Sequence, residues 1–455
     1  MSQSIPKRNI VLIILLLIAL IASLAALAAV YLRQPSNERF TLKFWGYWEP
    51  EIAAALLTDY QTTHPRVTIE YEKRELGRYR ETLQNRLDNG SGPDIFYFHS
   101  KWLPMLVRQL SIAPKNIFDE KELLSAYFPV AKKDLAPSGQ VWGAPVSFEG
   151  LSLLYNNELF RAVGLDKPPS SWDELKLKYI SALVMKNKTG EIQTGGIALG
   201  TAANVDYASQ ILELLMAQNG TTFIKNNQLL IDQSFSAETP KRNLGADALT
   251  FYNSFAQGQG STWAADLPSS VEAFVKGQVA MIIAPNSRIN EILKLSQEQA
   301  TPVDLKVALL PQLPERDPIT WGTTWALGVS SYSQRQKESW EFIKYLSSKE
   351  VSEKITTLQK RLVTVPDIPA RLDASSALKD DPYLGPYIAQ APKAADFYGV
   401  EHTEDNGLND QVSEIFHEMI DTPGSAESKL NLAAAKLNQV FISYNLLPLP
   451  VKTEK

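Results

Sequence analysis

Tryptophan rings gather where apolar strand patterns end in this sequence. Trp45 and Trp48 follow the alternating run of residues 40–44, and Trp321 and Trp325 enclose a glycine and two threonines. A core tryptophan usually lies inside an apolar run, whereas rings at strand ends can line a pocket beyond the carboxyl ends of the strands. Such rings can stack on the C–H faces of a sugar, while a carboxylate such as that of Glu49 accepts hydroxyl hydrogen bonds.

Other polar residues extend this candidate site. Glu149 follows Phe148 at a predicted crossing between two lobes, Asn286 and Arg288 follow a second crossing, and Lys101 follows an apolar strand. Alternative roles remain open: a ring can fill the core, Asn286 can cap a helix, and Arg288 or Glu149 can face solvent. We predict that the following residues bind the ligand: Trp45, Tyr47, Trp48, Glu49, Lys101, Trp102, Glu149, Trp263, Asn286, Arg288, Trp321, Trp325 and Arg361.

The sequence gives little support for enzymatic chemistry. The chain has no cysteine, and its four histidines show no metal-ligand spacing, so disulfides, thiol catalysis and a zinc site are not expected. Motifs of serine hydrolases, zinc proteases and nucleotide-binding loops are absent. Glu49 and Glu149 could form a glycosidase pair, but carboxylates are also common in sugar sites without catalysis. We therefore predict a binding protein without catalytic residues, cofactor or metal.

Length and charge indicate a folded protein of two domains. A chain of 455 residues is too long for one compact core in most folds, and a hydrophobic share of 44% suits a globular protein. The net charge is −5 and the chain has no basic block. These features argue against a nucleic-acid partner.

The N-terminal region predicts a membrane anchor. Residues 10–32 are uncharged and mainly apolar, and as a helix they would be roughly 35 Å long, enough to cross a hydrocarbon core of about 30 Å. Lys7 and Arg8 place residues 1–9 in the cytoplasm, and residues 33–39 form a tether outside. The alternative is a cleaved and secreted protein, because Ala26, Leu27 and Ala28 resemble a signal-peptide cleavage site. We prefer a single-pass anchor in the cell membrane because the apolar run exceeds an ordinary signal sequence.

Periodicity predicts an α/β fold. Apolar or alternating runs at residues 40–44, 67–71 and 94–98 indicate strands, and amphipathic patterns from Pro50 and over about 77–87 indicate the helices between them. This order is typical of βαβ units and a parallel sheet. Further strands are expected at residues 151–155, 279–283 and 325–329, and further helices at 208–218, 336–347 and through much of 408–444.

Five segments, taken in order, resemble the extracellular solute-binding protein family one, the group that contains maltose-binding protein. The most specific is VWGAPVSFEGLSLLYNNELFRAVGLDKPPSSWDEL at residues 141–175. The others are SGPDIFYF at residues 91–98, FVKGQVAMIIAPNSRI at 274–289, LLPQLP at 309–314 and WGTTWALGVSSYSQRQKESWEFIKYLSS at 321–348. Glu149 falls where maltose-binding protein has an acid that touches sugar. Lys101 departs from that protein, which carries an acid at this point, so the identity of the ligand stays open.

The resemblance implies a two-lobed periplasmic-binding-protein-like (type II) fold with a hinge and an interlobe cleft. We assign residues 40–147 and 286–346 to lobe 1, and residues 148–285 and 347–450 to lobe 2. The implied function is the substrate-binding component of an ABC importer, which captures a small solute, in our interpretation a sugar, and delivers it to a membrane permease. A membrane-anchored ligand sensor and a glycoside-processing enzyme are the alternatives.

Overall fold

A computed structural model describes residues 16–24, 38–237, 240–258, 260–314, 316–400 and 402–447. Residues 16–24 are helical and their side chains are exposed. The rest of the predicted anchor, residues 10–15 and 25–32, and residues 33–37 of the predicted tether lie outside the described part of the chain. Within the described residues, no helix is both long and apolar enough to span a bilayer.

Lobe 1 is built on the predicted parallel strands. β1 (Phe40–Gly46) pairs in parallel with both β2 (Val67–Lys73) and β3 (Ile95–His99). All five residues of β3 are buried, as expected for a strand covered on both faces. The helices on this side of the molecule are α2 (Pro50–Thr63), α3 (Tyr79–Asp88), α4 (Leu103–Leu106), α5 (Glu120–Ala126), α6 (Pro129–Leu135), α14 (Gln336–Leu346), α15 (Lys349–Gln359) and α16 (Leu372–Ser375).

Lobe 2 continues the same sheet beyond a pair of long strands. β9 (Val279–Pro285) pairs in parallel with β6 (Ile192–Ile197), which pairs with β5 (Met185–Lys186). The short strands β7 (Ile224–Lys225) and β8 (Gln228–Leu229) form a separate hairpin. The helices of this lobe are α7 (Asn157–Ala162), α8 (Trp172–Glu174), α9 (Ile180–Leu183), α10 (Ala208–Gln218), α11 (Leu244–Asn253), α12 (Ser270–Val275), α13 (Ile289–Gln297), α17 (Gly385–Gln390), α18 (Leu408–Asp421) and α19 (Ala426–Ser443).

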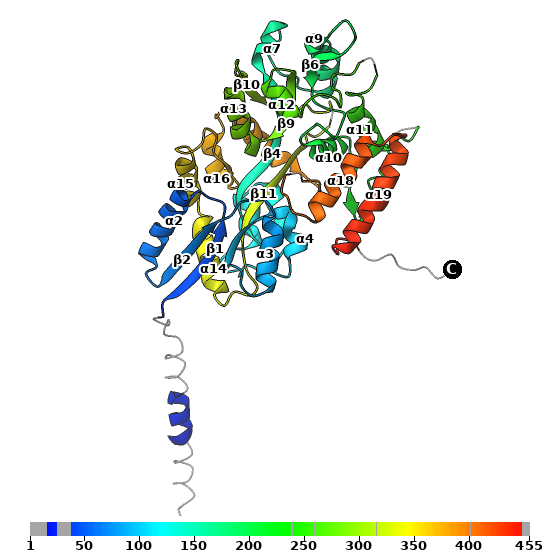
Figure 1. Cartoon of the computed structure of the whole chain (residues 1–455). Helices are drawn as coiled ribbons and strands as arrows, with labels where there is room; N and C mark the ends of the chain where they lie inside the picture. Colours follow the sequence, from blue (N-terminus) through cyan, green and yellow to red (C-terminus); the bar gives the residue numbers. More distant parts are fainter. Residues whose placement is uncertain are drawn as a thin grey trace, which may run out of the picture.

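Two long strands, β4 (Ala144–Asn156) and β11 (Thr320–Val329), run from one lobe to the other (Figure 1). They are antiparallel to each other, with Gly322 opposite Gly150 and Thr324 opposite Phe148. β11 pairs with β3 from Trp325 onward, and β4 pairs with β9 from Leu151 onward. The centre of this ladder, residues 148–150 and 322–324, is therefore the hinge between the lobes.

The structure corrects the predicted lobe boundaries. We placed a return to lobe 1 at residue 286, but β10 (Leu305–Ala308) pairs with the lobe 2 half of β4, so the chain returns only within β11. We also placed residues from 347 onward in lobe 2, but Lys354 on α15 contacts Asp59 on α2 of lobe 1. The strand pairing that decides these points joins residues far apart in the sequence, and local patterns do not contain it.

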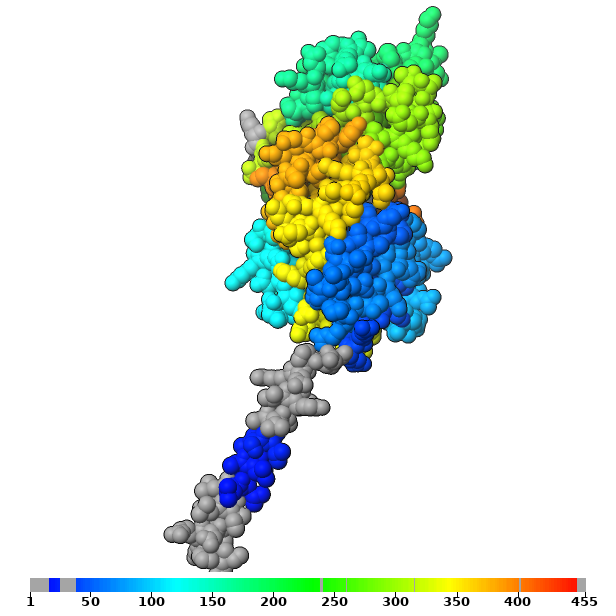
Figure 2. Space-filling model, turned by 90° about the vertical axis from the view of Figure 1, so that its left-hand side faces the viewer, coloured from blue at the N-terminus to red at the C-terminus, as the bar shows by residue number. Residues whose placement is uncertain are grey.

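A third crossing lies between α16 and α17. β12 (Ile368–Pro369) pairs with β4 beside Phe148, and Tyr387 on α17 donates a hydrogen bond to Ala284 O in lobe 2. The strand β13 (Ala394–Ala395) then pairs with the start of β11. In the space-filling view, the yellow and orange residues of this region lie between the blue part of lobe 1 and the green part of lobe 2 (Figure 2).

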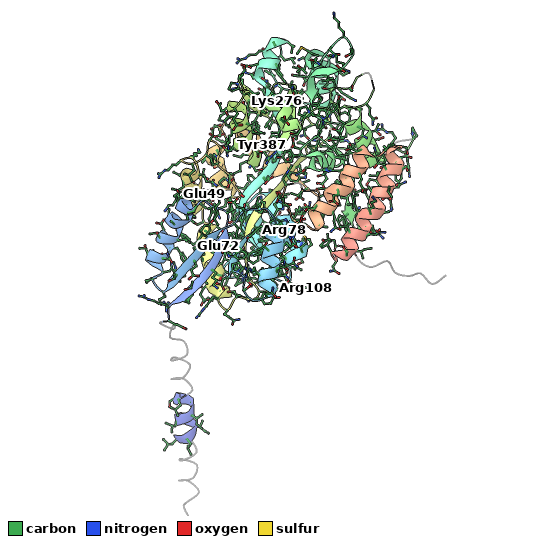
Figure 3. All side chains as sticks on the ribbon, in the orientation of Figure 1. Glu49, Glu72, Arg78, Arg108, Lys276 and Tyr387 are labelled. Atoms are coloured by element: carbon green, nitrogen blue, oxygen red, sulfur yellow. The ribbon has the colours of Figure 1, made fainter. Side chains whose placement is uncertain are left out.

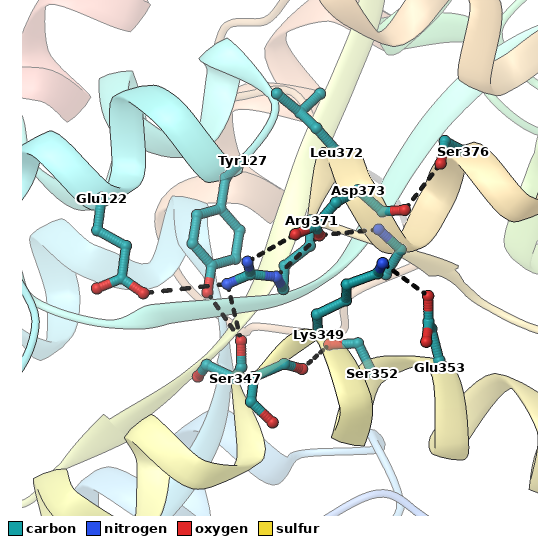
Figure 4. Close-up of polar contacts among 12 residues, drawn as sticks. Glu122, Tyr127, Ser347, Lys349, Ser352, Glu353, Arg371, Leu372, Asp373 and Ser376 are labelled. Atoms are coloured by element: carbon teal, nitrogen blue, oxygen red, sulfur yellow. Dashed lines mark hydrogen bonds and ion pairs between the residues drawn. The ribbon is translucent and has the colours of Figure 1, made fainter.

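Arg371 fixes the third crossing to lobe 1 (Figure 4). Its guanidinium forms two hydrogen bonds with Asp373, of 3.0 and 2.9 Å, and a third of 3.2 Å to Ser347 O. The Tyr127 hydroxyl donates to the same carbonyl at 3.3 Å. The hydrogen bonds with Arg371 lower the pKa of Asp373, so this pair stays ionised.

We expect Gly322→Ala to destabilise the protein by about 1–3 kcal/mol. A Cβ atom at this position would lie 2.6 Å from the Phe148 ring and 3.0 Å from Glu149 O, so the hinge would have to shift. Urea denaturation of the two proteins measures the difference. Gly260→Ala is the matched control, because no atom lies within 4 Å of its Cβ position. Equal effects of the two substitutions would contradict the packing of the hinge around Phe148.

Candidate ligand-binding site

A cavity of about 380 Å³, which we call the hinge cavity, lies between the lobes at the hinge strands. Tyr47 and Tyr97 of lobe 1, Glu149 of the hinge, and Tyr207 and Arg288 of lobe 2 all line it. Residues of β3, β4 and β11, and of the loop that follows β1, reach it because these strands end or cross at this level. The hinge cavity therefore has the position that the resemblance implies for a ligand between two lobes.

Three aromatic rings stack along one wall of the hinge cavity. The Tyr47 and Tyr97 ring centroids are 4.0 Å apart with an interplanar angle of 23°. Tyr97 and Trp325 follow at 4.8 Å with an angle of 7°. The Trp325 ring also contacts Trp102 edge-on at 5.3 Å, so the core holds the stack in place. Tyr47 is the half-buried member and offers a flat apolar face to a ligand.

Two partly buried carboxyl groups flank this aromatic stack. Glu149 accepts a 3.3 Å hydrogen bond from Trp325 Nε1, and burial raises its pKa above the usual range. Asp367 accepts hydrogen bonds from the Tyr47 hydroxyl at 2.9 Å and from Gln359 Nε2 at 2.6 Å, and burial raises its pKa too. Neither carboxyl group forms an ion pair among the described residues. Ligand hydroxyl groups could donate to these oxygens and offset the cost of burying them.

Three other polar atoms of the hinge cavity have no hydrogen-bond partner among the described residues. Arg74 Nε, Arg288 Nε and the Tyr207 hydroxyl are buried and form no hydrogen bond within the described residues. Buried donors of this kind are normally satisfied. The guanidinium groups are otherwise held, because Arg74 lies 3.6 Å over the Trp45 ring and Arg288 pairs with Glu291 at 2.5 Å. An uncharged ligand rich in oxygen atoms would supply the missing acceptors.

The rim of the hinge cavity carries a small ion network. Lys73 Nζ lies 3.0 Å from Glu49 and 3.0 Å from Glu75. Figure 3 shows Glu49 at the start of α2, at the end of this helix that lies toward lobe 2. The Glu49 side chain is half exposed, so it borders the entrance and does not reach the buried part of the cavity.

The comparison with protein families agrees with this geometry. The profile of the family described as bacterial extracellular solute-binding protein matches residues 46–353, more than half of the chain. The chain belongs to this family. A protein named as a binding protein in Brucella abortus (strain 2308) is 22% identical over 303 residues, which cover 65% of this chain and 68% of the relative. The family consists of binding proteins, so the prediction that the chain is not an enzyme is confirmed.

Solved structures confirm the two-lobed fold of this solute-binding protein. The sugar-binding protein MalE from Xanthomonas citri superposes with a TM-score of 0.70 at 17% identity, covering 89% of this chain and 98% of that protein. The cyclic alpha-maltosyl-1,6-maltose binding protein from Arthrobacter globiformis gives a TM-score of 0.70 at 19% identity, covering 89% and 100%. At these identities the likeness concerns the fold alone.

About half of the predicted ligand-binding residues gather at the hinge cavity of this solute-binding protein. The residues that line it are Tyr47, Glu49, Glu149, Asn286, Arg288 and Trp325. Asn286 also holds the hinge itself, because its Oδ1 accepts from Gly150 N at 2.9 Å and its Nδ2 donates to Phe148 O at 3.3 Å. It is therefore not primarily a helix cap, which was the alternative role.

The remaining predicted residues do not line the hinge cavity. Trp48, Trp102 and Trp263 are at most 2% exposed and fill the core, because most of an indole surface is apolar and strand ends pack against helices here. Trp45 is buried beneath Arg74, and Arg361 is exposed on the turn after α15. Lys101 and Trp321 line a different cavity. The expectation that all the loop tryptophans share one pocket is therefore wrong.

Several residues that line the hinge cavity were not among the predicted ligand-binding residues. Tyr97 lies within the apolar run DIFYF, which we interpreted only as a buried strand. Tyr207 precedes α10 without any distinctive motif, and Asp367 lies in a segment to which the sequence patterns assigned no helix or strand. Their shared property is that they lie within or just before elements that converge at the hinge. A tyrosine within a buried strand is the one sign that the sequence offered for Tyr97.

Lys101 belongs to a buried ion network that joins the lobes. Its Nζ lies 2.7 Å from Asp134 Oδ1 on α6 and 2.7 Å from Asp396 Oδ2, next to β13. Lys133 Nζ adds a contact of 2.8 Å to Asp396 Oδ1. Burial opposes the charge on Lys101, but the two carboxylates outweigh it and raise its pKa, so the ammonium stays charged. Lys101 is thus a structural cation in this protein.

Trp321 is held by a second buried acid, Glu213 on α10. Glu213 accepts hydrogen bonds from Trp321 Nε1 at 3.1 Å and from Gly399 N at 2.7 Å. The carboxyl group is almost fully buried, and burial raises its pKa to about 8. At neutral pH it is therefore mainly protonated, and it connects β11 with the chain that follows β13.

The raised pKa of Glu213 predicts a pH-dependent stability. Between the ordinary value of about 4.3 and the native value of about 8, the folded protein holds a proton that the unfolded chain has lost. The free energy of unfolding should therefore fall as the pH rises through this range. We expect the stability of Glu213→Gln relative to the wild type to increase by a few kcal/mol as the pH rises from about 5 to 9. Urea titrations at each pH measure this difference. Parallel pH profiles of the two proteins would contradict this assignment.

Proposed function

We propose that this chain is the extracytoplasmic substrate-binding component of an ABC importer, and that it captures a saccharide in the hinge cavity and presents it to a membrane permease. The observation that carries the proposal is the arrangement of the Tyr47, Tyr97 and Trp325 stack between the partly buried carboxyl groups of Glu149 and Asp367. Stacked rings with adjacent carboxylates suit a pyranose, which has apolar C–H faces and a rim of hydroxyl groups.

The position of the hinge cavity also supports a transport role. Its walls come from both lobes, so a ligand that contacts Tyr47 on one side and Tyr207 on the other favours the closed arrangement of the lobes. A permease can then distinguish the liganded from the empty form. Sugar ligands are named for both solved relatives described above, which is consistent with this choice of ligand class.

A thermal-shift screen tests the ligand class. The full chain, in a detergent without a sugar headgroup, is heated with neutral mono- and oligosaccharides, with sugar phosphates and with polyamines. A saccharide at about 100 times its Kd should add roughly 2.7 kcal/mol of stability. Tyr47→Ala should abolish the shift, whereas Tyr332→Ala, which removes a half-exposed ring outside the hinge cavity, should retain it. A thermal shift only with polyamines or sugar phosphates would contradict the assignment of the ligand as a neutral saccharide.

We further propose that residues 10–32 anchor the protein in the cell membrane. Residues 16–24 are helical with exposed apolar side chains, including Leu16, Ile18 and Leu24. An uncharged apolar helix of this kind is stable when lipid surrounds it. Alkaline extraction of membranes that contain the full chain should leave the protein in the pellet at its full mass. A shortened protein that is released into the medium would favour cleavage instead.

A further inference from the structure

A second and larger cavity lies between the lobes. Its volume is about 710 Å³, and it shares no lining residue with the hinge cavity. Lys101 and Asp134 contribute to it from lobe 1, Glu213 and Trp321 line it from α10 and β11, and Phe397 comes from the chain after β13. The volume lies within the range of small-molecule binding sites. We call it the second cavity.

The charges in the wall of the second cavity compensate one another. Lys101 and Lys133 face the carboxylates of Asp134 and Asp396 at 2.7 to 2.8 Å. Two cations and two anions leave no net charge, and Glu213 is mainly protonated at neutral pH because burial raises its pKa. The wall therefore has no uncompensated charge to attract an ion, and an uncharged ligand fits it better.

Aromatic faces and a free hydroxyl complete the second cavity. Six aromatic side chains line it: Trp142, Phe223, Trp321, Phe397, Tyr398 and Tyr444. Phe223 and Phe397 stack at 4.5 Å, while the Trp142 ring is half-buried at the cavity wall. Thr221 Oγ1 is buried in the same wall without a hydrogen-bond partner among the described residues. Flat rings, a free hydroxyl and a neutral wall together match the surface of an uncharged sugar.

We propose that the second cavity is a separate binding site for a neutral oligosaccharide. The proposal rests on the proposed function only in taking the ligand class to be saccharides. Because the wall comes from both lobes, an oligosaccharide bound there contacts both of them. Its binding then changes the affinity of the hinge cavity, and a ligand in the hinge cavity changes the affinity of the second cavity by the same factor.

Calorimetric titration tests this proposal. The probes are glucose, galactose, maltose and maltotetraose, added to the full chain in a detergent without a sugar headgroup. Ala217→Phe places a ring in the second cavity from α10, and Ala300→Phe places the same ring on an exposed surface of lobe 2 as the control. We expect two binding events in the wild type, of which Ala217→Phe weakens one at least tenfold and changes the other only by the smaller factor that couples the two cavities. Ala300→Phe should match the wild type.

Two further variants separate the two proposals. Trp142→Ala removes a half-buried ring of the second cavity and should weaken the same event if Ala217→Phe folds poorly. Glu149→Gln alters only the hinge cavity and should weaken the other event. If Glu149→Gln removes all saccharide binding while Ala217→Phe and Trp142→Ala leave the isotherm unchanged, the second site is overturned and the proposed function stands. If no probe binds to the wild type, the second site is overturned, while the thermal-shift screen decides the proposed function.

Discussion

Replacing Glu149 with glutamine is expected to raise the Kd for the saccharide in the hinge cavity roughly 10- to 100-fold. Hydrogen bonds to a charged group contribute about 1.5–3 kcal/mol, and the amide keeps the shape of the carboxylate but not its charge. Titration calorimetry measures the change. Glu291→Gln is the matched control, because Glu291 lines the same cavity with a half-exposed side chain that already pairs with Arg288.

The pH dependence of binding distinguishes this role from simple packing. Burial raises the pKa of Glu149, and a ligand hydroxyl donates best to the ionised form. Protons therefore compete with the saccharide, and the wild-type affinity should fall as the pH drops through that raised pKa. The Glu149→Gln protein should lack this dependence. An unchanged Kd in the variant, or the same pH profile in both proteins, would show that Glu149 does not contact the ligand.

Lys101→Met is expected to lower the free energy of unfolding by about 3–5 kcal/mol, the usual effect of removing one partner from a buried ion pair. The substitution leaves Asp134 without a cation and Asp396 with Lys133 alone. The side chain of Lys101 is 6% exposed, so water cannot compensate the loss. Urea denaturation of the purified chain gives the measurement.

Lys133→Met serves as the comparison for this prediction. Lys133 contacts the same Asp396 carboxylate, but its side chain is 57% exposed, so its removal should change stability by less than about 1 kcal/mol. A triple variant, Lys101→Met with Asp134→Asn and Asp396→Asn, should recover part of the loss because no buried charge remains unpaired. If Lys101→Met is as stable as Lys133→Met, the network does not hold the lobes together.

Local patterns in the sequence were sufficient to predict much of the fold. The strands β1, β2, β3 and β9 and the helices α2, α10 and α14 lie where periodicity placed them, because each is defined by the burial of its own side chains. The lobe boundaries were missed because they depend on pairing across long distances. The antiparallel pairing of β10 with the far end of β4 joins residues near 305 and 156, and no local pattern encodes it.

The candidate site was predictable only in part, for a related physical reason. A strand end marks where the chain reaches the edge of a sheet, but not whether the next side chain turns toward the cleft or the core. Tyr47 and Trp48 are neighbours, yet Tyr47 lines the hinge cavity while Trp48 packs edge-on against Phe44. The sequence thus indicated aromatic rings near the hinge, but the stack with Tyr97 depends on the pairing of β3 with β11, which local patterns do not contain.

A crystal structure of the chain with the saccharide that gives the largest thermal shift is the most direct test of the hinge cavity. We predict a sugar ring stacked on Tyr47, with hydroxyl groups within hydrogen-bonding distance of Glu149 and the Tyr207 hydroxyl. A second saccharide in the second cavity is compatible with this prediction. A complex in which the ligand is bound elsewhere and the hinge cavity holds only water would contradict the account.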